Sequence, residues 1–425
     1  MANTRGGDWA ARAANLWRQV ELRSLLSRAV IAVGAGNPTD AGVSWTLPTE
    51  AERPIVLGAG VPDPATMPVD DLRDALHHVL STEAEEALSY GGVLGFSGLR
   101  EALAQRQSRL DGLALEPENF LLNNGGAGSI DSVCRAFLEP GDAAIIEGPT
   151  FSGSARTFRG HLAEVAQAPL DEEGLLVGIA SEAIKKAERA GRRVKLLYTV
   201  PDFHNPTGAT LSLGRRYDLL ELCAAHQVLI LEDTAYTELY FNDPPPPSLY
   251  SLSQGEGVLK VGSFSKIIAP GLRVGWVQGR PDFIEALARV RYDMGVSPLL
   301  LRALAEHVGG GRLEAHLKGM RPIYAEKCET LSRSLQEHCA GYVRFRKPAG
   351  GFFLWVECLG PSAREIREAA ALEGLVFPGG DSFYLRREQD DASHLRLAFS
   401  TASLEELAEV GPRLRAAFRR ALGEG

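Results

Sequence analysis

The chain has 425 residues, of which 45% are hydrophobic and 23% are charged, with 45 Lys and Arg against 54 Asp and Glu and a net charge of −9. These proportions are typical of a soluble globular protein with enough apolar material for two or three domains. The acidic balance argues against a protein that coats nucleic acid or an anionic membrane, because neutralising phosphates requires clustered Lys and Arg.

The chain is predicted to start with an arm or linker over residues 1–53. A helix is expected over Trp9–Arg28, followed by a Gly-, Pro- and Thr-rich stretch up to Pro54. No apolar run reaches the length of about 18 residues that a membrane helix needs, and Arg28 interrupts the one stretch that could pass for a secretory core. We therefore expect no targeting segment and no membrane partner.

From about Tyr90 to Val277, short apolar runs alternate with longer amphipathic stretches, which indicates βαβ units around a parallel sheet. The expected strands are Phe120–Leu122, Ala144–Ile146, Lys195–Thr199, Val228–Leu231, Val258–Val261 and Val274–Val277. Among the helices between them, one is expected to be capped by Ser212 and to bury a stripe formed by Tyr217, Leu220 and Ala224.

From about Pro298 the pattern changes to long amphipathic helices and then to short strands. The helices are expected over Leu301–Val308 and Leu313–Ala340, and the strands over Phe352–Trp355 and Leu395–Phe399. This part of the chain is predicted to form a separate α+β lobe.

Five cysteines are scattered along the chain without a CxxC pair: Cys134, Cys223, Cys328, Cys339 and Cys358. An odd number at such spacings does not indicate a disulfide framework, so a reducing, cytoplasmic location is expected. The signatures HExxH, GxxxxGK[ST] and GxSxG are absent, which removes the usual indications of a metalloprotease, a P-loop protein or an α/β-hydrolase. No metal site is predicted.

Three turns that follow expected strands contain polar residues suited to ligand binding. The Gly-rich run Asn123–Asp131 opens a helix, whose free backbone N–H groups would face an anion such as phosphate, although glycine also serves simply to tighten a bend. Asn205-Pro-Thr-Gly208 is as typical of a plain turn as of a ligand-binding segment. Glu232 and Asp233 end a strand at the sheet edge where ligands of open α/β sheets bind.

Lys266 lies between a buried strand and the apolar run Ile-Ile-Ala-Pro. Such surroundings desolvate the amine and depress its pKa, which suits Schiff-base chemistry. Arg273 follows seven residues later, close enough to bind an anionic group on whatever Lys266 holds.

In this order and spacing, the motifs resemble those of the fold-type-I pyridoxal-phosphate (PLP) aminotransferases, class I/II, in the α-aminoadipate and kynurenine aminotransferase branch. The resemblance spans roughly Pro54 to Arg415. It rests on the Gly-rich turn, Asn205-Pro-Thr-Gly208, Glu232-Asp233, Ser263-Phe-Ser-Lys266, Arg273 and Leu395-Arg396-Leu-Ala-Phe-Ser400. It implies an α/β fold with a large domain on a mostly parallel, seven-stranded sheet and a smaller α+β domain. The large PLP-binding domain would span 90–297, and the small domain would combine 54–89 with 298–425.

The resemblance also implies roles for individual residues. Lys266 would form the Schiff base and then move a proton, and Asp233 would keep the pyridine nitrogen protonated. Asn205 and Tyr236 would hydrogen-bond the ring's phenolic oxygen, and Phe151 would stack on the ring.

The remaining implied contacts concern the phosphate and the substrate. Ser263, Arg273 and the backbone of Gly126 and Ala127 would hold the phosphate. Tyr90 would reach the phosphate of a neighbouring subunit, which implies a homodimer. For the substrate, Arg396 would clamp the α-carboxylate, with further contacts from Asn205 and Gly60, and the pocket wall would include Val61, Phe151 and the arm.

The chain departs from the family pattern at three places. Gly125-Gly-Ala-Gly128 lacks the usual serine and glutamine, Asp233-Thr-Ala-Tyr236 replaces Asp-Asp-Pro-Tyr, and Phe151 replaces tyrosine. A lost hydrogen bond to a charged phosphate costs about 1.5–3 kcal/mol, so weaker PLP binding is expected unless Ser129 or Asn124 compensates. This divergence is consistent with a specialised biosynthetic enzyme.

Three interpretations of function remain open. The first is an aminotransferase that acts on an α-amino acid and a 2-oxo acid. The second keeps the fold and PLP but acts as a decarboxylase, a β-eliminating lyase or an oxygen-dependent oxidase or hydroxylase, because the fold does not determine the outcome. The third is the effector domain of a MocR-type regulator, which needs a DNA-binding winged helix. For DNA binding, the arm offers only the scattered Arg12, Arg18, Arg23 and Arg28.

Overall fold

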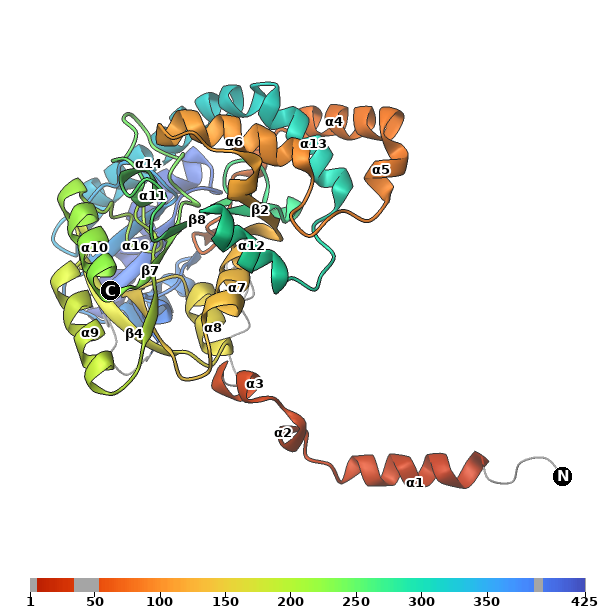
Figure 1. The fold of residues 1–425 in the computed structure, drawn as a ribbon. Coiled ribbons are helices and arrows are strands. Elements are labelled where there is room, and N and C mark those ends of the chain that lie inside the picture. The colour runs from red at the N-terminus through yellow and green to blue at the C-terminus, as the bar shows by residue number, and fades with distance from the viewer. Residues whose placement is uncertain (1–5, 34–52, 386–392, 425) are drawn as a thin grey trace.

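The structure, a computed structural model, describes residues 6–33, 53–385 and 393–424. Its centre is an eight-stranded sheet in the order β2-β9-β8-β7-β6-β3-β4-β5 (Figure 1). The strands are β2 Phe120–Asn123, β3 Ala143–Gly148, β4 Glu164–Asp171, β5 Gly174–Leu175, β6 Val194–Thr199, β7 Leu229–Asp233, β8 Val258–Ser263 and β9 Gly275–Gln278. Strands β4, β3, β6, β7 and β8 pair in parallel, whereas β9, β2 and β5 pair antiparallel.

The six strands expected in this region are confirmed, and the fold class with them, but the predicted count of seven strands is wrong by one. The additional strand is β5, two residues that turn back along β4. Neither β4 nor β5 was expected, because β4 lacks an apolar run. It contains Gln167 and Pro169, which lie in the part of the strand that pairs with β3 but not with β5.

Helices cover the sheet. They are α6 Ser97–Asp111, α7 Gly125–Phe137, α8 Ser152–Gly160, α9 Val177–Arg189, α10 Leu213–His226, α11 Leu249–Leu252, α12 Pro281–Arg289 and α13 Pro298–Gly309. Helix α10 follows Ser212 as expected, but the serine side chain makes no capping hydrogen bond. The predicted apolar stripe of α10 is wrong for Tyr217 and Ala224, which are exposed, although Leu220 packs against the large core.

The buried face of α10 consists of Arg216, Leu219 and Cys223, while Tyr217 is 53% exposed. The helix is rotated in this way because Arg216 forms an ion pair with Asp202 inside the large domain. A pattern of apolar residues alone does not reveal that an arginine belongs to the buried face.

A second core lies in the smaller lobe. Strands β10 Val343–Phe345, β11 Phe353–Cys358 and β13 His394–Ala398 form an antiparallel sheet. Around it lie α15 Ala363–Leu372, α16 Leu404–Ala421 and a two-stranded pairing of β1 Ile55–Val56 with β12 Leu375–Val376. The α+β lobe expected in the C-terminal part of the chain is therefore present, and β1 links it to the segment that follows the arm.

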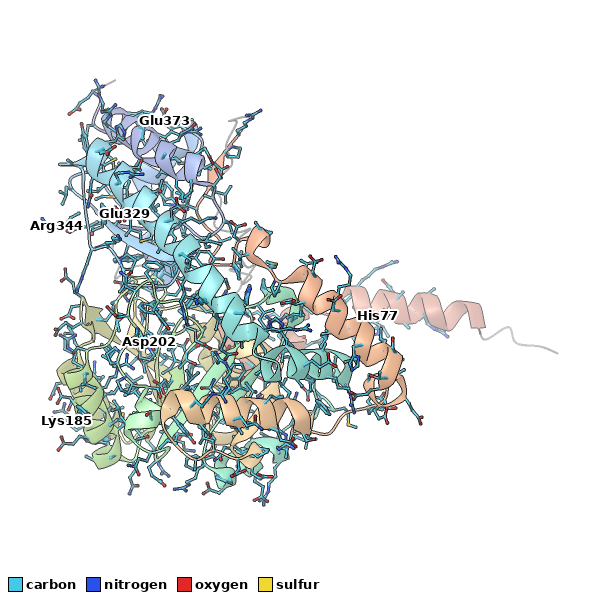
Figure 2. The ribbon with its side chains drawn as sticks, turned by 90° about the horizontal axis from the view of Figure 1, so that it is seen from above. His77, Lys185, Asp202, Glu329, Arg344 and Glu373 are labelled. Carbon is cyan, nitrogen blue, oxygen red and sulfur yellow. The ribbon has the colours of Figure 1, made fainter. Side chains whose placement is uncertain are left out.

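Helix α14, Arg312–Cys339, belongs to both cores. Its first half, up to Tyr324, packs in the large core, and its second half, from Cys328, packs in the small one. Figure 2 shows this helix, with Glu329 on its second half, extending between the lobe of Glu373 and the part of the molecule that contains Asp202.

The two cores therefore meet within α14 and not at the predicted boundary between residues 297 and 298. Helices α4 Val69–Thr82 and α5 Ala84–Leu88, expected in the small domain, pack on α13 through Ala75, Val79 and Ala87. The amphipathic pattern specifies that a helix buries one face, but it does not specify which core receives that face.

The single helix expected over Trp9–Arg28 is divided into α1 Gly6–Arg18, α2 Leu22–Leu25 and α3 Arg28–Val33. Figure 1 shows α1 extending away from the body, and α3 is attached to α8, where Arg159 donates a hydrogen bond to the carbonyl oxygen of Ala32 at 2.6 Å. Residues 11–33 contain no buried side chain. The rest of the expected linker, over 34–52, lies outside the described residues. Within the parts of the chain that are described, no helix is long and apolar enough to cross a membrane.

Candidate active site

The predicted site residues gather at the carboxyl ends of the parallel strands. Asp233 ends β7 and Ser263 ends β8, while Asn205 and Lys266 lie in the loops that follow β6 and β8. Parallel strands place their carboxyl ends at the same sheet edge, so these loops meet although the sequence separates them.

Lys266 is half-buried, and its amine faces the segment that follows β1. Its Nζ donates a hydrogen bond to the carbonyl oxygen of Gly60 at 2.7 Å and lies 6.0 Å from the ring centroid of Tyr236. Burial lowers the pKa of Lys266 to about 8, aided by the charges of Arg396 and Arg273 and opposed by that of Asp233. A fraction of the lysine is therefore a neutral amine near neutral pH.

Asp233 accepts hydrogen bonds on both carboxylate oxygens. The hydroxyl of Tyr198 donates to Oδ2 at 2.8 Å, and the backbone N–H of Ala235 donates to Oδ1 at 3.1 Å. Burial raises the pKa of Asp233, while these two hydrogen bonds and the charge of Lys266 act in the opposite direction.

Arg396, on β13, brings the small lobe into the site. Its guanidinium donates to Oδ1 of Asn205 at 2.9 Å and to the carbonyl oxygen of Gly58. It also lies 4.6 Å and 4.7 Å from the ring centroids of Phe353 and Phe383. Burial lowers the pKa of Arg396 to about 10, so the side chain remains positively charged at neutral pH.

Asn205 joins Arg396 to Tyr236. While its Oδ1 accepts from Arg396, its Nδ2 donates to the hydroxyl of Tyr236 at 3.4 Å. Burial raises the pKa of Tyr236, whose ring lies edge-on to Phe352 and Phe353. The Tyr236 hydroxyl therefore stays protonated.

Backbone N–H groups and Arg273 lie close together where α7 begins. Gly126 and Ala127 occupy the first turn of this 13-residue helix, so their N–H groups have no partner within it. Arg273 adopts a left-handed conformation (φ 52°) and donates to the carbonyl oxygen of Asn124 at 3.2 Å. Gly125 has a φ of 71°, in the left-handed region that favours glycine, and a Cβ on it would lie 3.0 Å from Nη2 of Arg273. Next to this turn, a Cβ on Gly126 would lie 3.7 Å from the Cβ of Ser263.

This arrangement fits PLP chemically. Helix N–H groups and Arg273 suit a phosphate, a buried carboxylate suits a protonated ring nitrogen, and an amine suits an aldehyde. Of the two residues expected to compensate for the altered phosphate turn, Ser129 is fully buried and Asn124 is exposed, 3.4 Å from Asp293.

Two predicted residues differ from the others in their surroundings. Phe151 is 40% exposed and precedes α8, and its ring lies so close to Gly153 that a Cβ there would be 2.5 Å from Cε1. Tyr90 is 88% exposed, so its side chain does not pack into the site of its own chain.

Several residues around the site were not foreseen: Tyr198, Ser154, Gly58, Phe353 and Phe383. Tyr198 and Phe353 occur in ordinary apolar strand patterns, which predict only burial. Phe383 lies in a short 3₁₀ segment, Gly380–Phe383, whose sequence gives no signal.

Comparison with known proteins gives the family of this chain. Residues 52–412 match the family model for aminotransferase class I and II. The chain belongs to this family. Its cofactor is therefore pyridoxal 5′-phosphate, as the resemblance implied. Among the described residues, no group of three or more His, Cys, Asp or Glu side chains could hold a metal ion.

Three relatives show the range of the family. The chain is 32% identical over 368 residues to aromatic-amino-acid aminotransferase 1 of Thermococcus litoralis, covering 86% of this chain and 88% of that protein. It superimposes with a TM-score of 0.84 and 27% identity on α-aminoadipate aminotransferase of Thermus thermophilus, solved with N-(5′-phosphopyridoxyl)-L-leucine, covering 96% and 100% of the two chains. It is also 31% identical to an uncharacterized HTH-type transcriptional regulator of Bacillus subtilis, covering 87% of this chain and 74% of that protein.

Proposed function

We propose that this protein moves an amino group between an α-amino acid and a 2-oxo acid through a Schiff base between Lys266 and PLP. The observation that supports this most is the position of the Lys266 amine, which has a lowered pKa and lies among Asp233, Arg273 and Arg396 at one sheet edge. The family membership supports the reaction class.

Each residue has a role that its surroundings explain. PLP, when bound, supplies an electron sink for the substrate α-carbon. Lys266 would bind the cofactor aldehyde and, once released, would take a proton from that carbon and deliver it to C4′ of the cofactor, for which a pKa of about 8 is well matched to neutral pH. Asp233 holds the protonated ring nitrogen, and Arg273 with the first turn of α7 holds the phosphate.

Arg396 binds the substrate carboxylate. The contact with Asn205 and the two phenylalanine rings fix the orientation of its guanidinium before substrate arrives, so less ordering is needed on binding. Because Arg396 comes from the small lobe and Lys266 from the large one, substrate would contact both lobes.

We also propose a homodimer in which Tyr90 completes the neighbouring site. The exposure of Leu88 (71%), Tyr90 (88%), Tyr292 (76%) and Met294 (56%) supports this, because large exposed apolar side chains that lie near each other mark interfaces. The two segments are neighbours, since a Cβ on Gly295 would lie 2.8 Å from the carbonyl oxygen of Gly92. Sedimentation of the purified protein should give a dimer mass, and a monomer that is fully active would contradict the proposal.

A cytoplasmic location remains part of the proposal. It is supported by the five cysteines, which are all buried and form no disulfide within the part of the chain that the structure describes.

The decisive experiment follows the visible absorbance of the PLP-loaded protein, without oxygen, as α-amino acids are added one at a time. We expect one class of amino acid to convert the cofactor to its pyridoxamine form, with release of the matching 2-oxo acid. Release of carbon dioxide or ammonia, or turnover only after oxygen is admitted, would instead establish a decarboxylase, a lyase or an oxidase. Borohydride reduction should attach the cofactor to Lys266, and Lys266→Ala should lose both this attachment and turnover.

The similarity to HTH-type regulators provides a second test. The purified chain should not bind DNA with sequence specificity, because over residues 11–33 the arginines of the arm are scattered among exposed apolar side chains. Specific binding to a DNA duplex would favour the regulator interpretation.

A further inference from the structure

A buried hydroxyl pair lies behind the carboxylate of Asp233. Tyr198, on the central strand β6, is 1% exposed, and Ser154, on α8, is 2% exposed. The Ser154 hydroxyl donates to the Tyr198 hydroxyl at 2.9 Å, and the Tyr198 hydroxyl donates to Oδ2 of Asp233 at 2.8 Å. The chain of donors runs in one direction and ends at the carboxylate.

The direction of this chain follows from the number of protons available. A tyrosine hydroxyl has one proton, and an ionised carboxylate can only accept, so the Tyr198 proton points to Asp233 and its oxygen is left to accept from Ser154. Burial and the charge of Asp233 raise the pKa of Tyr198, so the phenol keeps its proton. The Tyr198 ring is held by Phe158 of α8, with centroids 5.8 Å apart.

The surrounding charges do not by themselves guarantee an ionised Asp233. The charge of Lys266 favours the carboxylate, while the buried carboxylate of Glu147 on β3 and the apolar surroundings disfavour it. Two hydrogen-bond donors, Tyr198 and the backbone N–H of Ala235, counter this burial. Only the Tyr198 donor can be removed by changing a side chain.

We propose that Tyr198, oriented by Ser154, is a positioning residue that keeps the Asp233 carboxylate ionised and turned toward the ring nitrogen of bound PLP. The inference rests on the proposed function in one respect, the assignment of Asp233 to that nitrogen. It adds that helix α8, which begins just after Phe151, supports Asp233 indirectly, because Ser154 of this helix holds the Tyr198 hydroxyl. Cofactor affinity therefore depends on a residue that never touches the cofactor.

The test measures the dissociation constant of PLP for the cofactor-free protein by equilibrium dialysis, in wild type and in Tyr198→Phe, Ser154→Ala and Tyr250→Phe. Tyr198→Phe should bind PLP on the order of tenfold more weakly at neutral pH, because one hydrogen bond to a charged group is lost. Ser154→Ala should lose about threefold, since the donor to Asp233 remains but is less well oriented. Tyr250→Phe is the matched control: Tyr250 is 2% exposed and its hydroxyl interacts with Gln278, away from Asp233, so PLP affinity should not change.

The pH dependence supplies a readout that a merely structural role would not alter. A donor to the charged form lowers an acid's pKa, so removing it raises the pKa of Asp233. As the pH falls, PLP affinity should therefore decline at a higher pH in Tyr198→Phe than in wild type. An acid limb at the same pH in both proteins would overturn the proposal, as would equal dissociation constants.

A double-mutant cycle with Asp233→Asn separates this inference from the proposed function. If Tyr198 acts through Asp233, adding Tyr198→Phe to Asp233→Asn should weaken PLP binding by less than about twofold further, whereas independent effects would multiply. If Asp233→Asn alone weakens binding but Tyr198→Phe does not, only the inference fails. If Asp233→Asn leaves PLP binding unchanged, the assignment of Asp233 fails and the inference fails with it. Circular dichroism of each variant verifies that the fold persists.

Discussion

Gly60 is a position in the site where even the methyl side chain of alanine should do damage. A Cβ built on Gly60 would lie closest to Cζ of Phe353 and 2.7 Å from Cε1 of the same ring, whereas ordinary van der Waals contacts begin at 3.4 Å. The Phe353 ring cannot move into solvent, because it is fully buried, edge-on to Tyr236 and 4.6 Å from the Arg396 guanidinium. In Gly60→Ala, either the ring or the backbone must therefore shift.

The size of the shift gives the expected effect. The shortfall is at least 3.4 − 2.7 = 0.7 Å, the value at Cε1, and is larger at Cζ. It must appear as displacement of Phe353, which would move Arg396, or of the Gly60 carbonyl, which would leave Nζ of Lys266. Overpacking of this kind costs about 2 kcal/mol of stability. A misplacement near 1 Å in an active site can cost about a hundredfold in rate, so we expect kcat/KM of Gly60→Ala to fall by about ten- to a hundredfold.

The measurement is steady-state kinetics with the amino acid donor that the absorbance experiment identifies, together with thermal unfolding of the PLP-loaded protein. Gly319→Ala is the matched control: Gly319 lies inside α14, its Cβ would meet nothing within 4 Å, and the change should preserve kcat/KM and slightly raise stability. If Gly60→Ala retains the kcat/KM of the wild type within about twofold, the tight contact with Phe353 does not position the site and the reasoning is refuted.

Three further predictions follow from burial and charge. The pKa of Lys266 is lowered from 10.5 to about 8 in the folded chain, so between these pH values the unfolded chain binds more protons than the folded chain. The unfolding free energy of the cofactor-free protein should therefore rise with pH across this window. Urea unfolding from pH 7.5 to 11 should show a smaller rise in Lys266→Met, and an identical slope would contradict the lowered pKa. Arg396→Gln should raise KM for the amino acid by on the order of a hundredfold through the lost carboxylate contact, and an unchanged KM would exclude Arg396 as the clamp. Arg216→Met leaves Asp202 buried without its cation, so urea unfolding should show a loss of about 3–5 kcal/mol in unfolding free energy. Adding Asp202→Asn should restore part of this stability. A loss below about 1 kcal/mol would argue that the ion pair does not stabilise the fold.

Much of the site could be predicted from the sequence because its chemistry lies in short segments at strand ends. Asp233, Ser263 and Lys266 each end or follow an apolar run, and β strands of this length are recognisable from their composition. The structure brings Lys266, Asp233, Asn205, Tyr236 and Arg396 together, while the roles assigned to them remain predictions.

Two of the site residues that sequence analysis missed, Tyr198 and Ser154, reach the site through contacts between elements that are far apart in the sequence. Tyr198 contacts Asp233 because β6 and β7 are neighbours in the sheet, and Ser154 contacts Tyr198 because α8 packs against that region. Neither contact has a local signal, since a buried tyrosine in an apolar strand looks the same whether or not its hydroxyl has a partner.

The sequence by itself determined the family, the cofactor and the sheet edge at which the site lies, because these depend on residue types at fixed local spacing. Tertiary structure alone decided that Gly60 lies against Phe353 and accepts from Lys266, 206 positions away, and that α13 and half of α14 belong to the large core. Such contacts depend on strand order and on which core receives each apolar face, and a one-dimensional pattern of apolar residues specifies neither.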